Sequence, residues 1–153
     1  MKKNICIMLL MAVLASFSMM AQDKMIEVPA SRIPHLAQQS LKAYYPGVEV
    51  ARVIKHKSKI KNNYEVTLAD STWIEFDKDG NWITVVPYGD AAVPPTMVDG
   101  RVATYLQDRF PGLRVVKMRR DRKNEQNQYY MLENGQEVTF DCYFKPVEAT
   151  PAP

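Results

Sequence analysis

Apolar and polar residues alternate strictly along several short stretches of the chain, which is the pattern of half-buried β-strands. Residues 64–68 place Tyr64, Val66 and Leu68 on one face, and residues 73–77 alternate in the same way. Further strands are expected at 48–57, 81–86, 113–119, 128–132 and 136–141, with a short last one near 143–144. Asp-Gly or Asn-Gly pairs lie between neighbouring strands, so the pattern predicts hairpins and an antiparallel sheet.

Two segments have the 3.6-residue apolar spacing of amphipathic helices. The first is expected at 31–45 with Ser31 as its cap, and the second at about 95–110, opened by Pro94-Pro95. Each helix ends at an aromatic-Pro-Gly sequence, because proline cannot continue the helix and glycine accepts the turn that follows. Between the helices, Asp79-Gly80 is expected to form a type I′ turn.

The same order of elements occurs twice along the chain. The aromatic-Pro-Gly sequences recur 65 positions apart, at Pro46 and Pro111, and the alternating strands that follow match at an offset of 64. Similarity at a fixed spacing over this length indicates an internal duplication. The two repeats are placed at residues 31–86 and 94–145, and a Pro/Ala-rich tail at 146–153 is expected to be disordered.

The fold class that follows is α+β, with two tandem repeats that each consist of a helix followed by an antiparallel sheet. One helix cannot cover a four-stranded sheet, and each repeat is near the lower size limit for independent folding. We therefore expect the two sheets to pair edge to edge or side by side, with both helices packed on one face of a curved sheet.

Residues 1–21 have the features of a signal peptide. Lys2 and Lys3 precede an apolar stretch, and small residues lead to an expected cleavage point after Ala21. The protein is therefore expected to be exported, to the periplasm or the extracellular space. The apolar stretch is shorter than the ~20 residues of a membrane span, and no other stretch is apolar enough, so no stable span is expected once the leader is removed.

Removal of the leader also changes what charge and cysteine content imply. The formal charge of the whole chain is +3, and without Lys2 and Lys3 it falls to +1, which gives no electrostatic reason to expect a nucleic-acid partner. Cys142 is then the remaining cysteine, so an internal disulfide is impossible. Because it follows an alternating strand, Cys142 is expected to be buried.

The sequence contains no pattern that assigns a catalytic or metal site. Residues 77–81 have the composition of a calcium loop, but strands flank them where an EF-hand needs helices, so a hairpin turn is expected. No spacing of Cys, His, Asp and Glu fits zinc, and there is no phosphate loop or nucleophile elbow. We therefore expect no enzyme activity, no cofactor and no metal.

After the first helix and a valine-rich strand, residues 64–68 read Tyr-Glu-Val-Thr-Leu and residues 74–82 read Ile-Glu-Phe-Asp-Lys-Asp-Gly-Asn-Trp. Together with the aromatic-Pro-Gly sequence, this pattern resembles the secreted bacterial PepSY-like family, also called putative β-lactamase-inhibitor-like. The resemblance covers roughly residues 31–145. The second repeat departs at 141–144, which lack the Gly and Trp, and Ser71 stands where a turn glycine is usual.

The resemblance implies a tandem α+β fold with a curved antiparallel sheet and helices on one side, and a location outside the cytoplasm. It carries no catalytic residue. The inhibitor part of the family name reflects a likeness of fold, and fold alone does not fix function.

The candidate site is the sheet face opposite the helices. If Ile74 and Phe76 face a helix, alternation turns the neighbouring side chains to the other face. Aromatic and methionine side chains on an uncovered face are typical of an interaction surface. The candidate binding residues are Trp73, Glu75, Tyr129, Met131 and Glu137.

Two functions from different classes stay open at this point. The first is a non-enzymatic binding module of the periplasm or cell surface, inhibitor-like in one version, that grips a protein or peptide with the open sheet face. The alternative is a small-molecule or metal binder, or sensor, of the cell envelope, with the ligand held between the repeats. The sequence names no partner and leaves the oligomeric state open.

Overall fold

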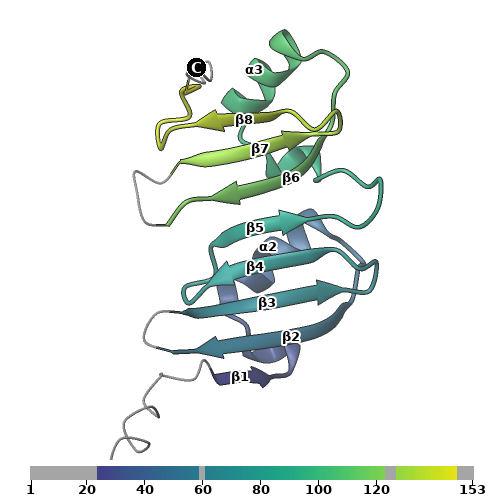
Figure 1. The fold of residues 1–153 in the computed structure, drawn as a ribbon. Helices are drawn as coiled ribbons and strands as arrows, with labels where there is room; N and C mark the ends of the chain where they lie inside the picture. Colours follow the sequence, from purple (N-terminus) through teal and green to yellow (C-terminus); the bar gives the residue numbers. More distant parts are fainter. Residues whose placement is uncertain (1–23, 59–60, 123–126, 148–153) are drawn as a thin grey trace, which may run out of the picture.

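The computed structural model describes residues 24–58, 61–122 and 127–147. Within these ranges the chain forms an eight-stranded antiparallel sheet whose strands lie side by side in chain order (Figure 1). The strands are β1 (Lys24–Glu27), β2 (Val50–Lys57), β3 (Asn62–Leu68), β4 (Trp73–Asp77), β5 (Trp82–Val86), β6 (Val115–Arg120), β7 (Gln128–Leu132) and β8 (Glu137–Phe140). The helices are α2 (His35–Tyr44) and α3 (Gly100–Arg109), with single 3-10 turns at Ala30–Arg32 and Pro95–Met97. The predicted α+β class is therefore confirmed.

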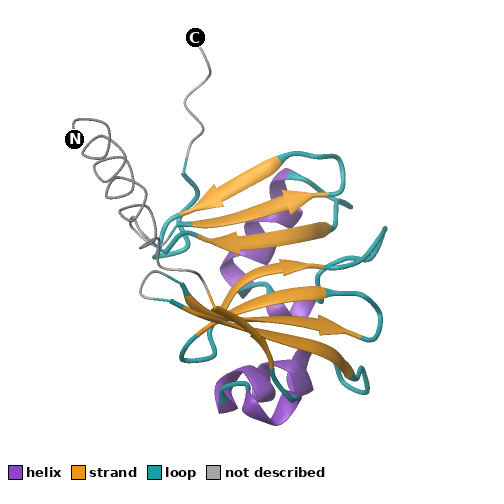
Figure 2. Cartoon of the chain, turned by 60° about the horizontal axis from the view of Figure 1, so that its bottom comes forward, coloured by secondary structure: helices purple, strands orange, loops and turns teal. Residues whose placement is uncertain are grey.

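The sheet consists of two halves joined at one seam. In the first half α2 precedes β2 to β5, and in the second half α3 precedes β6 to β8. The halves meet edge to edge where β5 pairs with β6 through Thr84 opposite Arg119 and Val85 opposite Met118. Both helices lie on the same side of the sheet, so no helix of residues 24–58, 61–122 and 127–147 covers the other face (Figure 2).

Both helices begin later than the sequence pattern suggests. Ser31 does not cap α2; it lies in the 3-10 turn, and Pro34 holds the N-cap position. The residue before a proline is driven to extended geometry, and Ile33 has φ −70° and ψ 150°, so a helix cannot run through this point. In the second half the prolines open the 3-10 turn, and α3 starts after Asp99, whose side chain accepts a hydrogen bond from the Arg101 N–H at 3.0 Å.

One core runs beneath both halves, between the helices and the sheet. From α2 it receives Ala37 and Leu41, and from α3 it receives Val102 and Leu106, at the spacing of one helical face. Leu36, in the first turn of α2, lies outside this face and is 43% exposed. The alternation expected at 64–68 and 73–77 is confirmed, and the strand residues of the core are Val53, Tyr64, Val66, Leu68, Ile74, Phe76, Val85, Met118, Tyr130, Leu132 and Phe140.

The hairpin at Asp79-Gly80 is present, but the expected type I′ geometry is wrong. A type I′ turn needs positive φ at both central residues, whereas in this turn Gly80 alone has it, at 94°. The Asp77 N–H bonds the Asn81 carbonyl and the Gly80 N–H bonds the Asp77 carbonyl. This is the three-residue loop in which a type I turn is followed by one left-handed residue.

Three expectations concern the ends of the chain. The signal peptide at 1–21 lies outside the described residues. The tail was expected from 146, but Pro146 forms a bridge with Phe140 and the Val147 N–H bonds the Thr139 carbonyl, so pairing continues to 147. Cys142 is exposed, not buried, because it lies in the turn that follows β8 and not in the strand itself.

Candidate binding face

The five candidate residues all lie on the sheet face away from the helices. On β4, Ile74 and Phe76 are fully buried in the core, and Trp73 and Glu75 alternate with them and are half-buried. On β7 the same alternation places Tyr129 and Met131 opposite the buried residues of that strand. The face assignment made from periodicity therefore agrees with the burial pattern.

The strand register arranges this face into two rows, of which the first crosses the seam through Thr84 and Arg119. The first row runs through Glu65, Glu75, Thr84, Arg119, Tyr129 and Thr139. The second row contains Thr67, Trp73 and Val86 in the first half and Lys117, Met131 and Glu137 in the second.

The candidate residues share these rows but do not converge on a point. Trp73 and Glu75 lie on β4, whereas Tyr129 and Met131 lie on β7, three strand spacings or about 14 Å away. Groups this far apart cannot act on one atom. The arrangement suits contact with an extended partner.

The carboxylates in the first row are held by neighbouring polar groups. Glu65 Oε1 lies 2.8 Å from His56 Nε2 and 3.2 Å from Lys61 Nζ. Glu75 accepts hydrogen bonds from the Asn63 amide and, at 3.5 Å, from the Thr84 hydroxyl. The hydrogen bonds from Lys61 to Glu65, and from Asn63 and Thr84 to Glu75, hold the two facing carboxylates in place on the sheet.

The second half of the face is basic and aromatic. The Arg119 guanidinium lies 4.0 Å from the centre of the Tyr129 ring, which is a cation–π contact between neighbouring strands. Met131 is half-buried beside them, and Glu137 on β8 is exposed. The first half of the face thus carries two facing carboxylates, and the second half carries a cation on an aromatic ring together with the exposed carboxylate of Glu137.

Sequence reasoning missed the residues that connect the two halves of the face. Thr84 and Arg119 occupy the seam between β5 and β6, and each follows from the alternation of its own strand. What the alternation could not supply is that these two residues are neighbours, because the pairing of the halves depends on tertiary contacts.

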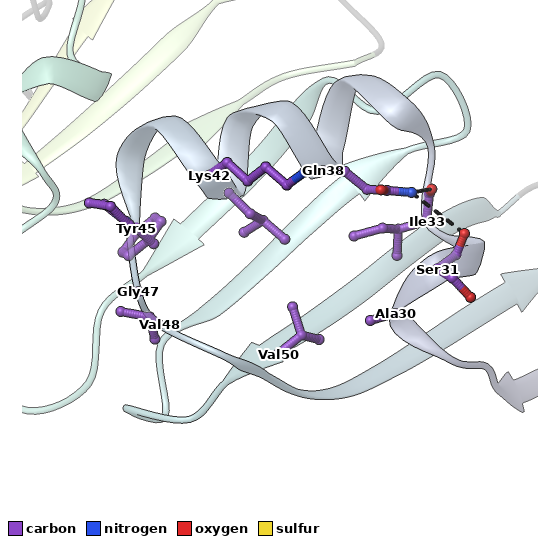
Figure 3. Close-up of a pocket in the computed structure, with 11 residues that line it drawn as sticks. Ala30, Ser31, Ile33, Gln38, Lys42, Tyr45, Gly47, Val48 and Val50 are labelled. Atoms are coloured by element: carbon purple, nitrogen blue, oxygen red, sulfur yellow. Dashed lines mark hydrogen bonds between the residues drawn. The ribbon is translucent and has the colours of Figure 1, made fainter.

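A groove lies between the helix and the first strand of each half. The first has a volume of about 430 Å³, and Figure 3 shows Lys42 of α2 and Tyr45, the residue that follows α2, above Val48 and Val50. The second has a volume of about 380 Å³ and is lined at equivalent positions by Val98, Leu106, Phe110, Leu113 and Val115, among others. These duplicated grooves were not anticipated from the sequence.

The first groove contains a buried hydroxyl without an equivalent in the second. The Tyr45 hydroxyl is buried and has no hydrogen-bond partner among the described residues. Burial, with a smaller contribution from the Asp70 charge, raises the pKa of Tyr45 to about 12. Phe110 occupies the matching position, so the fold itself does not require this hydroxyl. At the other end of the groove, Gln38 Nε2 donates to the Ile33 carbonyl at 3.0 Å.

The part of the chain that the structure describes has neither a metal centre nor a membrane-spanning helix. No group of three or more His, Cys, Asp and Glu side chains is placed to hold a metal ion in these ranges. Neither helix in the same ranges is long and apolar enough to cross a membrane.

Comparison with known proteins identifies relatives of the whole repeat region. A family model described as "Putative beta-lactamase-inhibitor-like, PepSY-like" matches residues 18–63 and 62–146. A crystal structure from Bacteroides thetaiotaomicron, described as a putative calcium-regulated periplasmic protein, is 27% identical with a TM-score of 0.73 and covers 81% of this chain and 94% of its own. A putative periplasmic protein from Bacteroides vulgatus is 26% identical with a TM-score of 0.74 and covers 82% and 96%. No curated protein matches the chain significantly.

Proposed function

The chain belongs to the PepSY-like, putative beta-lactamase-inhibitor-like family, and from this membership and its open sheet face we propose that it is an exported, non-enzymatic binding module. Its partner is a protein or an extended peptide, which binds to the sheet face that the two helices leave uncovered. Export is supported by the leader-like sequence at residues 1–21 and by the periplasmic description of the structural relatives.

The observation that carries this proposal is the continuity of the face across the seam. One row of paired residues runs from Glu65 to Thr139 without a break. Aromatic side chains supply large contact area at low entropic cost, and fixed charges beside them set the register of a partner. Trp73, Tyr129 and Met131 are the expected anchors, with Glu75 and Glu137 as the charged contacts.

An inhibitory role is the narrower version of the same proposal. A protein inhibitor needs a preformed surface that loses little freedom on binding, and side chains held on a rigid sheet meet this need. The family description supports this version by its name alone, so the partner class stays a protein or peptide surface and is not narrowed to one enzyme.

Affinity capture from an envelope extract tests the proposal. The tagged protein is compared with the Trp73→Ala/Tyr129→Ala variant. Loss of two central aromatic anchors is expected to weaken binding by about a hundredfold or more, since such residues contribute about 2 kcal/mol each. The matched control is Tyr88→Ala/Tyr143→Ala, which removes two aromatic side chains that are 69% and 74% exposed elsewhere. A partner kept by the open-face variant, or lost equally in the control, would contradict the assignment of the face.

The second candidate function is the binding of a small apolar ligand in the envelope. The specific observation in its favour is the pair of equivalent grooves, since a ligand pocket is typically a concave, mostly apolar space of this order of volume. The same capture experiment separates the two candidates. A protein retained by the wild type alone supports the open face, and empty capture by every variant supports the grooves.

A further inference from the structure

A polar hollow lies at the seam on the helix side of the sheet, opposite the candidate binding face. Its volume is about 350 Å³. Its walls come from both halves: Tyr44 of α2 and Trp82 of β5 on one side, and Asp99, Arg120, Gln128 and Tyr130 on the other. Trp82 closes the motif that the sequence shares with the PepSY-like family, and the open face makes no use of it.

Arg120 is the unusual group in this hollow. Its guanidinium lies 3.8 Å from the centre of the Trp82 ring, and its Nε is buried with no hydrogen-bond partner among the described residues. Burial lowers the pKa of Arg120, and the charge of Asp77 acts on it without forming an ion pair. By contrast, Arg114 is paired with Glu133 at 2.9 Å. Arg120 is half-buried, and no carboxylate of the described residues lies within ion-pair distance of it. A partly desolvated cation of this kind is stabilised by an anion that binds beside it.

The surrounding groups are built into the fold and are not a loose surface patch. Gln128 is 5% exposed and Tyr130 is 1% exposed, and the Tyr130 hydroxyl donates to Gln128 Oε1 at 2.8 Å. The acidic group nearest the start of α3 is already neutralised, because both oxygens of Asp99 bind the Arg101 guanidinium, at 2.9 and 3.0 Å. The Arg120 charge is therefore not matched by Asp99.

The duplication does not account for this arrangement. The residue equivalent to Arg120 in the first half is Lys55. Lys55 pairs with Tyr64 across the strands, just as Arg120 pairs with Gln128. Its ammonium group lies 5.0 Å from the Tyr64 ring, and its other neighbour is the short edge strand β1. The stack of Arg120 on Trp82 needs a strand from the other half, so it is a property of the junction.

We propose that the seam hollow binds a small oxyanion, the carboxylate or phosphate group of a ligand, through Arg120 held on the ring of Trp82. A guanidinium presents several donors in one plane, which matches the oxygens of either anion. The ring fixes the orientation of the guanidinium and leaves its edge available. This site is separate from the open face, so a failure of one proposal would not contradict the other.

Tryptophan fluorescence can test the site directly. The chain contains two tryptophans, so Trp73→Phe leaves Trp82 as the reporter. We expect saturable changes in Trp82 emission when this variant is titrated with inorganic phosphate or with succinate at constant ionic strength. A response to phosphate alone assigns a phosphate group to the natural ligand, and a response to succinate assigns a carboxylate.

Arg119→Gln is the matched control for Arg120→Gln, since it removes the same charge from the adjacent residue on the opposite face. In the Trp73→Phe background, Arg120→Gln is expected to weaken anion binding by about tenfold or more, and Arg119→Gln by less than about twofold. Arg120→Lys keeps the charge but loses the planar fork, and intermediate binding is expected, which covers the case in which the Gln variant fails to fold. The proposal would be overturned if neither phosphate nor succinate gave a saturable response. Equal weakening of anion binding by Arg119→Gln and Arg120→Gln would also overturn it.

Discussion

At the scale of single residues, the turns show how one backbone geometry is met by different side chains. The loops that end at Thr72, Asn81, Gln136 and Lys145 share the same pair of hydrogen bonds and place one left-handed residue before the last position. That residue is glycine in two of them, but Ser71 has φ 66° and Phe144 has φ 62°. A left-handed conformation costs about 1–2 kcal/mol for a residue with a Cβ, so these two turns carry strain.

Local contacts explain why the phenylalanine is tolerated. Asp141 Oδ1 accepts hydrogen bonds from the Tyr143 and Lys145 N–H groups, at 2.8 and 2.9 Å, which clamps the turn. The Phe144 ring is then covered by the Arg101 guanidinium at 4.0 Å. The second repeat thus keeps the turn of the first although it lacks the glycine.

Tyr45→Phe tests the buried hydroxyl of the first groove. Removing a buried polar group that has no partner should raise the free energy of unfolding at pH 7 by about 1 kcal/mol. The measurement is urea unfolding followed by circular dichroism. A loss of about 1 kcal/mol or more would show instead that the hydroxyl makes a stabilising bond.

The same variant should flatten the alkaline limb of the stability curve. The pKa of Tyr45 is about 12 in the folded protein and about 10 in the unfolded chain. The stability that the protein has while both states keep this hydroxyl protonated is therefore complete below pH 10 and is lost as the pH rises towards 12. The wild type should lose about 1–2 kcal/mol more than Tyr45→Phe over this interval. Tyr130 also has its pKa raised to about 12 by burial and is present in both proteins. If the stability of the two proteins fell in parallel between pH 10 and pH 12, the raised pKa of Tyr45 would be contradicted.

At the scale of elements, the first turn of α2 is positioned by a turn of the sheet that packs against it. The turn between β4 and β5 lies against the start of α2: a Cβ built on Gly80 would lie 2.7 Å from the Ala37 backbone nitrogen and 3.0 Å from the Pro34 side chain. The contact joins two elements that are more than forty residues apart in the chain. It fixes the end of α2 that the sequence pattern placed wrongly.

Gly80→Ala is therefore expected to destabilise the protein more than a change at an uncrowded glycine. Gly112 has nearly the same backbone conformation, with φ 80°, and a Cβ added there would meet nothing within 4 Å, so Gly112→Ala isolates the backbone strain. We expect a loss of about 1 kcal/mol for Gly112→Ala and about 2–4 kcal/mol for Gly80→Ala, measured by urea unfolding. Equal losses would show that the contact with α2 contributes nothing.

The strands were predictable from the sequence because each one has one face in the core, so apolar residues recur at every second position. Helix starts were harder, since Pro34 ends one conformation and begins another within an otherwise periodic run. Cys142 was misplaced for a related reason: alternation continues past Phe140 in the sequence, but the chain has already turned. The two grooves and the stacking of Arg120 on Trp82 depend on contacts between elements, which no local sequence pattern contains.

At the scale of the whole molecule, the joining of two halves creates features that neither half has alone. The uncovered face becomes continuous where Thr84 meets Arg119, and on the other side the same seam places Arg120 on Trp82. The face assignment of Trp73 and Tyr129 followed from strand periodicity. Their common surface follows only from the pairing of β5 with β6, which lie on either side of a long connection that includes α3.

Hydroxyl-radical footprinting of the protein, alone and with its captured partner, tests the binding face most directly, because Trp, Tyr and Met side chains all react when they are accessible. We predict that Trp73, Tyr129 and Met131 lose reactivity when the partner binds, while Tyr88 and Tyr143 keep theirs. Protection of Tyr88 or Tyr143 with unchanged reactivity of the three open-face residues would contradict the claim that the uncovered sheet face is where this protein binds.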